Sequence, residues 1–175
     1  MAAGRIVVRD VVEHPGAVGI VALDDSERVL MIRQYRHAVR QYLWEIPAGL
    51  LDEAGESAAA AAARELAEEV GVVAQRWSVL ADIYSSAGMT DEAYRVYLAR
   101  GLGAKSAEFV PGKDEEADMR EEWVPLAAAV ARVLTGDITN GLAAIGILAT
   151  DAARRTGYAE LRPVGAGWPA RPDRS

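Results

Sequence analysis

The sequence contains no cysteine. This absence excludes disulfide bonds, thiolate catalysis and cysteine-based zinc sites. Long apolar runs are missing as well. The longest, residues 142–150, is far shorter than the roughly 20 residues that a membrane-spanning helix needs. The N-terminus has no apolar core of the signal-peptide type. We therefore expect a soluble protein in the cytoplasm, without a membrane partner.

Positive charge is scarce relative to negative charge. The chain has 19 Lys and Arg residues against 26 Asp and Glu residues, which gives a net charge of −7. Nucleic-acid binding depends on cations that neutralise phosphates, so this balance argues against nucleic-acid partners. A small polyphosphate can still bind an acidic protein where a divalent metal reverses the local charge. The expected partner is a small molecule.

The length and the order of predicted elements indicate one domain. The 175 residues are 51% hydrophobic, which is enough for a single core. We expect this domain to cover residues 1–160 and an irregular or disordered tail to cover 161–175, which is rich in Pro and Gly. Strands are predicted before and after one strong helix, and two further helices follow; the expected strands are 5–12, 17–23, 29–34, 42–46, 77–84, 94–98 and 119–124, and the later helices are 126–134 and 142–154. This order predicts an α+β fold with a mixed β-sheet.

The strongest helix prediction covers residues 57–70. Apolar residues recur there at helical spacing, Ser57 is a suitable N-cap, and Gly71 follows at the position of a left-handed C-terminal residue. Glu65, Glu68 and Glu69 share one face of this helix, next to the apolar stripe. Because like charges at this spacing repel, a bound cation such as Mg²⁺ would explain them. Spacing alone leaves a solvated acidic face as an equally ordinary interpretation.

The residues around this helix resemble the Nudix box. Glu56, seven further residues and the run Arg64–Val72 match the box in register. One departure is the six residues between Gly49 and Glu56, where the box has five. The extra residue lies in the loop before the helix, where an insertion costs little.

The flanking segments are similar to the ADP-ribose pyrophosphatase branch of the Nudix family. These segments are 33–37, 43–52 and 85–92, and in the last of them Ala87 replaces the proline of the branch. The resemblance covers roughly residues 5–150 and implies a Nudix-like α/β/α sandwich. It also implies magnesium-dependent hydrolysis of ADP-ribose to AMP and ribose 5-phosphate, with Mn²⁺ as a possible alternative ion.

The resemblance also assigns roles to individual residues. It implies metal ligands at Glu65, Glu68, Glu69 and the backbone carbonyl of Ala48, of which Glu65 and Glu69 are the main ones. It implies that Glu56 and Arg64 brace the ligands. The substrate contacts that it implies are Arg36 for the phosphates, and Leu50, Ser85 and Ser86 near the terminal ribose.

The resemblance further places the general base on the acidic segment 114–118. Counted back from Trp123, Glu115 takes that position, and Glu116 is the nearest substitute. A homodimer is expected, paired through the apolar N-terminal residues 5–12. Two alternatives remain open. One is hydrolysis of another nucleoside diphosphate sugar or a nucleoside triphosphate, and the other is a non-catalytic module that binds ADP-ribose.

Overall fold

The computed structural model describes residues 6–103 and 119–170. In this part of the chain the elements are β1 (Ala17–Ala22), β2 (Arg28–Arg36), β3 (Gln41–Glu45), β4 (Ala48–Leu50), α1 (Ala58–Val70), β5 (Val73–Tyr84), β6 (Ala93–Gly103), β7 (Arg120–Pro125), α2 (Leu126–Leu134), α3 (Gly141–Arg154) and β8 (Arg162–Pro163).

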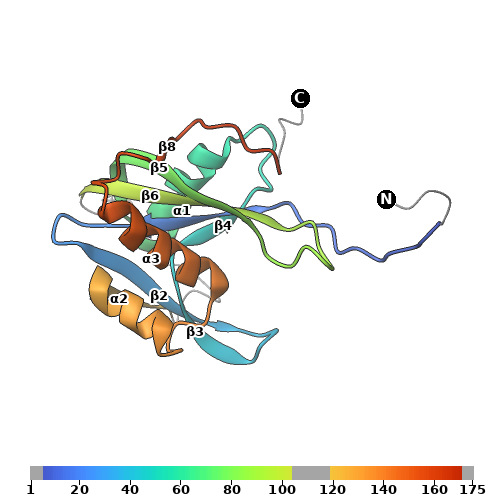
Figure 1. The fold of residues 1–175 in the computed structure, drawn as a ribbon, viewed down its shortest axis with the longest axis horizontal. Coiled ribbons are helices and arrows are strands. Elements are labelled where there is room, and N and C mark those ends of the chain that lie inside the picture. Colours follow the sequence, from blue (N-terminus) through green and yellow to red (C-terminus); the bar gives the residue numbers. More distant parts are fainter. Residues whose placement is uncertain (1–5, 104–118, 171–175) are drawn as a thin grey trace.

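Two sheets form the centre of the fold. One has the strand order β4-β1-β6-β5-β8, and the other has the order β3-β2-β7. Strands β1 and β6 are parallel, whereas the other neighbours are antiparallel. Helix α1 packs on one core cluster and α3 on another, on opposite sides of β1 and β6 (Figure 1). The expected α+β sandwich with a mixed sheet is confirmed.

Helix α1 has the boundaries that its sequence dictates. The Ser57 side chain accepts a hydrogen bond from the Ala60 N–H, and Gly71 closes the helix in the left-handed conformation. Leu66 and Val70 bury its apolar face in the core. This packing leaves the glutamate face toward the loop that carries β4, and the two segments are in contact.

Most predicted elements are confirmed to within a few residues, but the strand expected at 5–12 was wrong. Residues 6–11 form no strand, and Val12 makes only an isolated bridge with Thr90. A strand needs a neighbour for its backbone groups, and the described residues provide none alongside 6–11. Residues 6–16, which we call the N-terminal arm, project away from the sandwich (Figure 1).

The segment 162–170, which we call the C-terminal strap, packs against the sheet. Strand β8 pairs with β5. Arg95 is 3% exposed, and its guanidinium donates to the carbonyls of Ala166 and Gly167 at 2.6 and 2.9 Å. Trp168 lies with its ring 4.9 Å from that guanidinium carbon. The composition of this segment predicted an irregular or disordered tail, and Arg95 is the group that fixes it.

Within the described residues, no helix is both long enough and apolar enough to cross a membrane.

Candidate active site

The loop–helix unit from Ala48 to Val70 brings two of the predicted metal ligands, Glu65 and Glu69, next to Ala48 and Gly49. The backbone N–H of Ala48 donates to a carboxylate oxygen of Glu69 at 3.0 Å. A Cβ atom at position 49 would overlap the carboxyl group of Glu65, so only glycine permits this close approach. Glu65 and Glu69 therefore lie at the start of the loop, as neighbours of Ala48 and Gly49.

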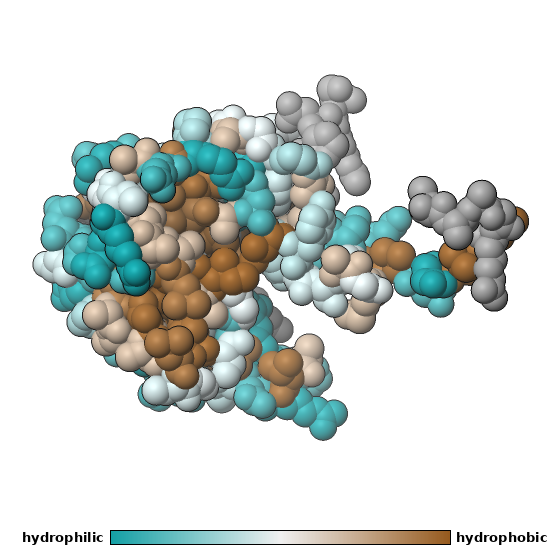
Figure 2. All heavy atoms as spheres, in the orientation of Figure 1, coloured by the Kyte–Doolittle hydropathy of each residue, from teal (hydrophilic) through white to brown (hydrophobic). Residues whose placement is uncertain are grey.

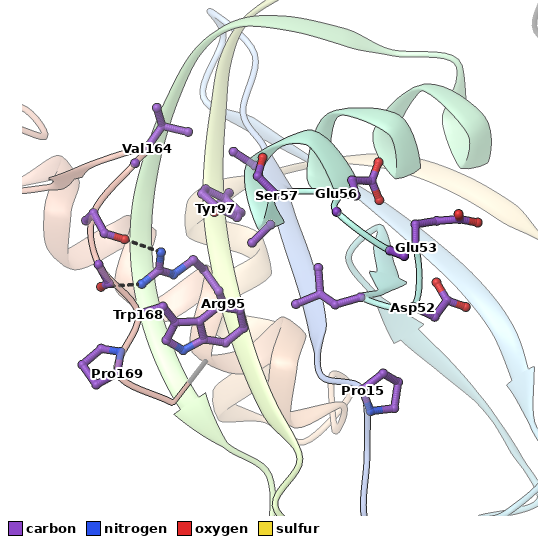
Figure 3. A pocket seen from close by; sticks show the side chains of 18 residues that line it. Pro15, Asp52, Glu53, Glu56, Ser57, Arg95, Tyr97, Val164, Trp168 and Pro169 are labelled. Atoms are coloured by element: carbon purple, nitrogen blue, oxygen red, sulfur yellow. Dashed lines mark hydrogen bonds between the residues drawn. The ribbon is translucent and has the colours of Figure 1, made fainter. Parts of the chain in front are cut away.

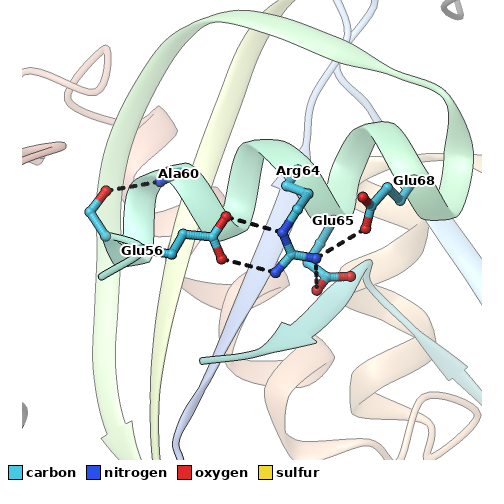
Figure 4. A network of polar contacts seen from close by, with 6 residues as sticks. Glu56, Ala60, Arg64, Glu65 and Glu68 are labelled. Carbon is cyan, nitrogen blue, oxygen red and sulfur yellow. Dashed lines mark hydrogen bonds and ion pairs between the residues drawn. The ribbon is translucent and has the colours of Figure 1, made fainter. Parts of the chain in front are cut away.

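Arg64 holds three glutamates at once (Figure 4). Its Nε and Nη2 atoms donate to the two carboxylate oxygens of Glu56, both at 3.0 Å. Its Nη1 atom donates to Glu65 at 2.7 Å and to Glu68 at 3.0 Å. The hydrogen bond from Arg64 lowers the pKa of Glu56 below its usual value. The loop and the helix are thus joined by one guanidinium group.

Glu65 has the opposite electrostatic environment. Burial raises its pKa, and the negative charges of Glu68 and Asp52 add to the effect, against the opposing contribution of Arg64. The carboxylate form of Glu65 is therefore strained electrostatically in the protein alone. An added positive charge would relieve this strain.

The same carboxylates are candidate ligands for a divalent cation. Within the described residues no three acidic or histidine side chains converge in a metal-binding arrangement. Glu65 and Glu68 point to Arg64 (Figure 4). Glu69 instead accepts a hydrogen bond from the backbone of Ala48. The donor set is nonetheless all oxygen, which hard cations prefer. On Glu65 and Glu68 a cation would displace Nη1 of Arg64, whereas Nε and Nη2 stay anchored on Glu56, so the residues fit a divalent cation.

Arg36 is oriented by a buried carboxylate. Glu45 is 2% exposed, and it accepts hydrogen bonds from Nε and Nη2 of Arg36 at 2.9 and 2.6 Å. The hydrogen bond with Glu45 raises the pKa of Arg36, and the charge of Glu69 adds to this. In the described part of the chain, Nη1 of Arg36 donates no hydrogen bond. The guanidinium thus keeps one nitrogen for another acceptor.

Glu92 and Tyr94 link the loop after β5 electrostatically to Arg36. Burial disfavours the ionised form of Glu92, but hydrogen bonds from Ser85 and Tyr94 and the electrostatic interaction with His14 outweigh it, so its pKa is lowered. Burial and the bond to Glu92 raise the pKa of Tyr94, which also interacts electrostatically with Arg36. Through Glu92 and Tyr94, Ser85 is thus linked to Arg36, the residue predicted to contact the phosphates.

Leu50 and Ser86, two of the expected substrate contacts, are exposed to solvent. Leu50 ends β4 and is 45% exposed, and Ser86 is exposed in the loop after β5. The predicted base Glu115 lies outside the described residues, as does its substitute Glu116. The sequence analysis missed Glu45 and Glu92. A single carboxylate between Trp44 and Ile46 in a strand was the available signal for Glu45.

A cavity of about 1080 Å³ lies beside the loop, between residues 51–59 and the C-terminal strap (Figure 3). Glu56, Arg95 and Trp168 are part of its lining, but neither Glu65 nor Glu69 is. This cavity is therefore next to the glutamate cluster and not the space in front of it.

Comparison with known proteins agrees with this geometry. The family model described as "NUDIX domain" matches residues 13–142. The chain is 50% identical to the ADP-ribose pyrophosphatase of Mycobacterium tuberculosis over 172 residues, which are 98% of this chain and 82% of the relative. It is also 35% identical to the CMP-5'-(N-acetyl-N-hydroxy-3-aminopropyl)phosphonate hydrolase of Streptomyces rubellomurinus, over 83% of this chain and 68% of that protein. A crystal structure of an ADP compounds hydrolase superimposes with a TM-score of 0.69 at 26% identity, covering 81% of this chain and 74% of the other.

Proposed function

Because the chain belongs to the NUDIX domain family, we propose that it is an enzyme that hydrolyses ADP-ribose to AMP and ribose 5-phosphate. The observation that carries this proposal is the loop–helix unit, in which Glu56, Arg64, Glu65 and Glu69 are held together beside Ala48. The near full-length similarity to an ADP-ribose pyrophosphatase supports this substrate.

The metal is magnesium in this proposal, with manganese as its substitute, and its ligands are Glu65, Glu68, Glu69 and the Ala48 carbonyl. When bound, the ion would neutralise the pyrophosphate and lower the pKa of the attacking water. The protein's own groups do the rest. Arg36, oriented by Glu45, offers Nη1 to a phosphate oxygen, and Leu50, Ser85 and Ser86 lie near the terminal ribose.

The chemical step joins the water oxygen to one phosphorus atom and breaks the bond from that phosphorus to the bridging oxygen. The proton of the water passes to a carboxylate, for which we propose Glu115 from its position in the sequence. AMP and ribose 5-phosphate leave, so no further reactant is needed.

One experiment tests the function and its metal together. The purified chain is incubated with ADP-ribose, other nucleoside diphosphate sugars and nucleoside triphosphates, each with and without Mg²⁺, and the products are identified. We expect ADP-ribose to turn over fastest, and only with the metal. Preference for a cytidine nucleotide, the substrate class in the name of the Streptomyces relative, would replace ADP-ribose in the proposal. Binding without turnover would indicate a non-catalytic module.

We also propose that the protein is a cytoplasmic homodimer that pairs through its N-terminal arm. The arm carries exposed apolar residues, among them Ile6 at 95% and Val8 at 83% exposed, and brown side chains mark its projecting part in Figure 2. Burial of these side chains against a second copy would remove them from water. Light scattering at micromolar concentration should give twice the mass of 18.7 kDa. A fully active monomer would refute the dimer, and cell fractionation would test the location.

A further inference from the structure

The base of the N-terminal arm is tied to the loop between β5 and β6. The N–H of Val12 donates to the carbonyl of Met89 at 2.9 Å, and the Thr90 hydroxyl donates to the Val12 carbonyl at 2.8 Å. The backbone N–H of His14 donates to the Asp91 carboxylate at 2.8 Å. Three consecutive residues, 89–91, therefore contact the arm, although some 77 positions separate the two segments in the chain.

The ring of His14 continues this contact toward the site. Its Nδ1 atom accepts a hydrogen bond from the Gly16 N–H at 3.0 Å. A ring nitrogen that accepts carries no proton, so the proton of the neutral ring is on Nε2. That atom lies 3.2 Å from Oε1 of Glu92, and it can donate to the carboxylate there. The backbone of the arm thus fixes both the tautomer and the direction of the ring.

Glu92 is the point where the arm meets the site residues. Its carboxylate also interacts with Ser85 and Tyr94, and its carbonyl accepts from the Ser85 N–H at 3.1 Å, which closes the loop. Tyr94 in turn interacts electrostatically with Arg36 and Glu45. Within the described residues, hydrogen bonds and electrostatic interactions thus link the arm to Arg36, the residue predicted to contact the phosphates.

We propose that His14 is a positioning residue for the substrate: its Nε2–H holds the Glu92 carboxylate and so fixes the loop Ser85–Glu92 in the form that receives the sugar end of a nucleoside diphosphate sugar. The proposal rests on the function stated above, because that function places Ser85 beside the ribose. His14 acts through Glu92 and touches no reacting atom. Its loss therefore weakens binding of ground state and transition state alike, which raises KM and spares kcat.

Three variants test this role: His14→Leu, His14→Gln and, as a matched control, His37→Leu. His37 is exposed in the turn between β2 and β3. For ADP-ribose with Mg²⁺ we expect His14→Leu to raise KM about tenfold and to change kcat less than about twofold, the scale of one hydrogen bond to a charged group. Glutamine also carries an N–H at the end of its side chain, so His14→Gln should restore most of the wild-type KM. The His37→Leu variant should behave as wild type.

Two outcomes would overturn the proposal while the wild type is active: an unchanged KM in His14→Leu, or equal losses in His14→Leu and His14→Gln that follow their melting temperatures. The second outcome would mean that the ring serves stability alone. A wild type that fails to hydrolyse ADP-ribose would instead reject the proposed function. In that case ¹⁵N NMR of the imidazole decides on His14, since the Nε2–H tautomer should be present in the wild type and the resonance of its Nε2 proton should shift in Glu92→Ala, which removes the acceptor. A different tautomer in the wild type would overturn the inference independently of activity.

Discussion

At the scale of single residues, the glutamates of α1 differ in what they bind, although the sequence presents them as one cluster. Glu65 and Glu68 share Nη1 of Arg64, whereas Glu69 accepts from the backbone of Ala48. Glu69 thus connects the helix directly to the loop that supplies the backbone carbonyl. This makes it the most informative position for testing the metal.

We expect Glu69→Gln to lower turnover of ADP-ribose by about a hundredfold or more without unfolding the protein. The amide keeps the shape and can still accept from Ala48, but it removes the charge that a divalent cation needs, which is worth several kcal/mol of transition-state stabilisation. Turnover and far-UV circular dichroism are measured side by side. Glu160→Gln, at an exposed position, is the control. Near-wild-type turnover in folded Glu69→Gln would remove the metal assignment.

The general base is a second prediction at this scale. Loss of a positioned base costs on the order of a hundredfold, so we expect Glu115→Gln to lower kcat by that factor while binding of Mg²⁺ and ADP-ribose persists. Glu116→Gln is the matched control. A large loss in Glu116→Gln alone would shift the assignment by one residue, and no loss in either variant would place the base elsewhere.

At the scale of elements, the C-terminal strap depends on one buried guanidinium. Arg95 is bound by Asp82 at 2.7 and 2.9 Å and by two strap carbonyls, whereas Arg162 contacts the same aspartate from a more exposed position at 2.7 Å. The strap forms one wall of the cavity in Figure 3. Replacement of Arg95 should therefore destabilise the protein more than replacement of Arg162.

We expect Arg95→Leu to lower the free energy of unfolding by about 3 kcal/mol, because it leaves buried carbonyls unpaired and breaks a largely buried ion pair. Arg162→Leu removes an exposed pair and should cost no more than about 1 kcal/mol. Urea titration of both variants measures the difference. Equal small losses would show that the strap contributes little to folding.

The sequence predicted regular elements better than their long-range contacts. Helix α1 carries its own start and stop residues, so its ends were predictable from local pattern. Strand β4 was missed because three residues after a proline offer no periodicity, and it forms only by pairing with β1. The contact of His14 with Glu92 joins segments that are distant in the chain, and Glu45 reaches Arg36 only through the pairing of β2 with β3. No local pattern contains such contacts.

At the scale of the whole molecule, the ion pairs make stability depend on pH. The pKa of Asp82 is lowered because Arg95 and Arg162 outweigh the effect of its burial, and Arg64 lowers the pKa of Glu56. A lowered folded-state pKa gives stability that is present above the unfolded value, near pH 4, and is lost as the pH falls through the folded value. The raised pKa of Glu65 acts in the opposite direction.

We therefore expect the free energy of unfolding of the metal-free protein to fall below about pH 4, since the carboxylates with a lowered pKa, Asp82, Glu56, Glu92 and Asp151, outnumber Glu65, whose pKa is raised. Urea titrations at pH 7, 5, 4 and 3 measure this. The loss of stability at low pH should be smaller in Arg95→Leu, because this variant lacks one of the two arginines that lower the pKa of Asp82. A free energy of unfolding that rises from pH 5 to pH 3 would contradict the lowered pKa values of Asp82 and Glu56.

The contacts of Arg64 also decide how the molecule behaves before it meets a metal. The guanidinium serves as a built-in counter-ion for Glu65 and Glu68, so the acidic helix face need not repel itself in metal-free protein. Under the proposed metal assignment, loading would exchange one cation for another, with Glu56 retaining the displaced arginine. We therefore expect that a chelator would strip the metal without unfolding the protein, and that the apparent affinity for the metal would include the work of moving Arg64 aside.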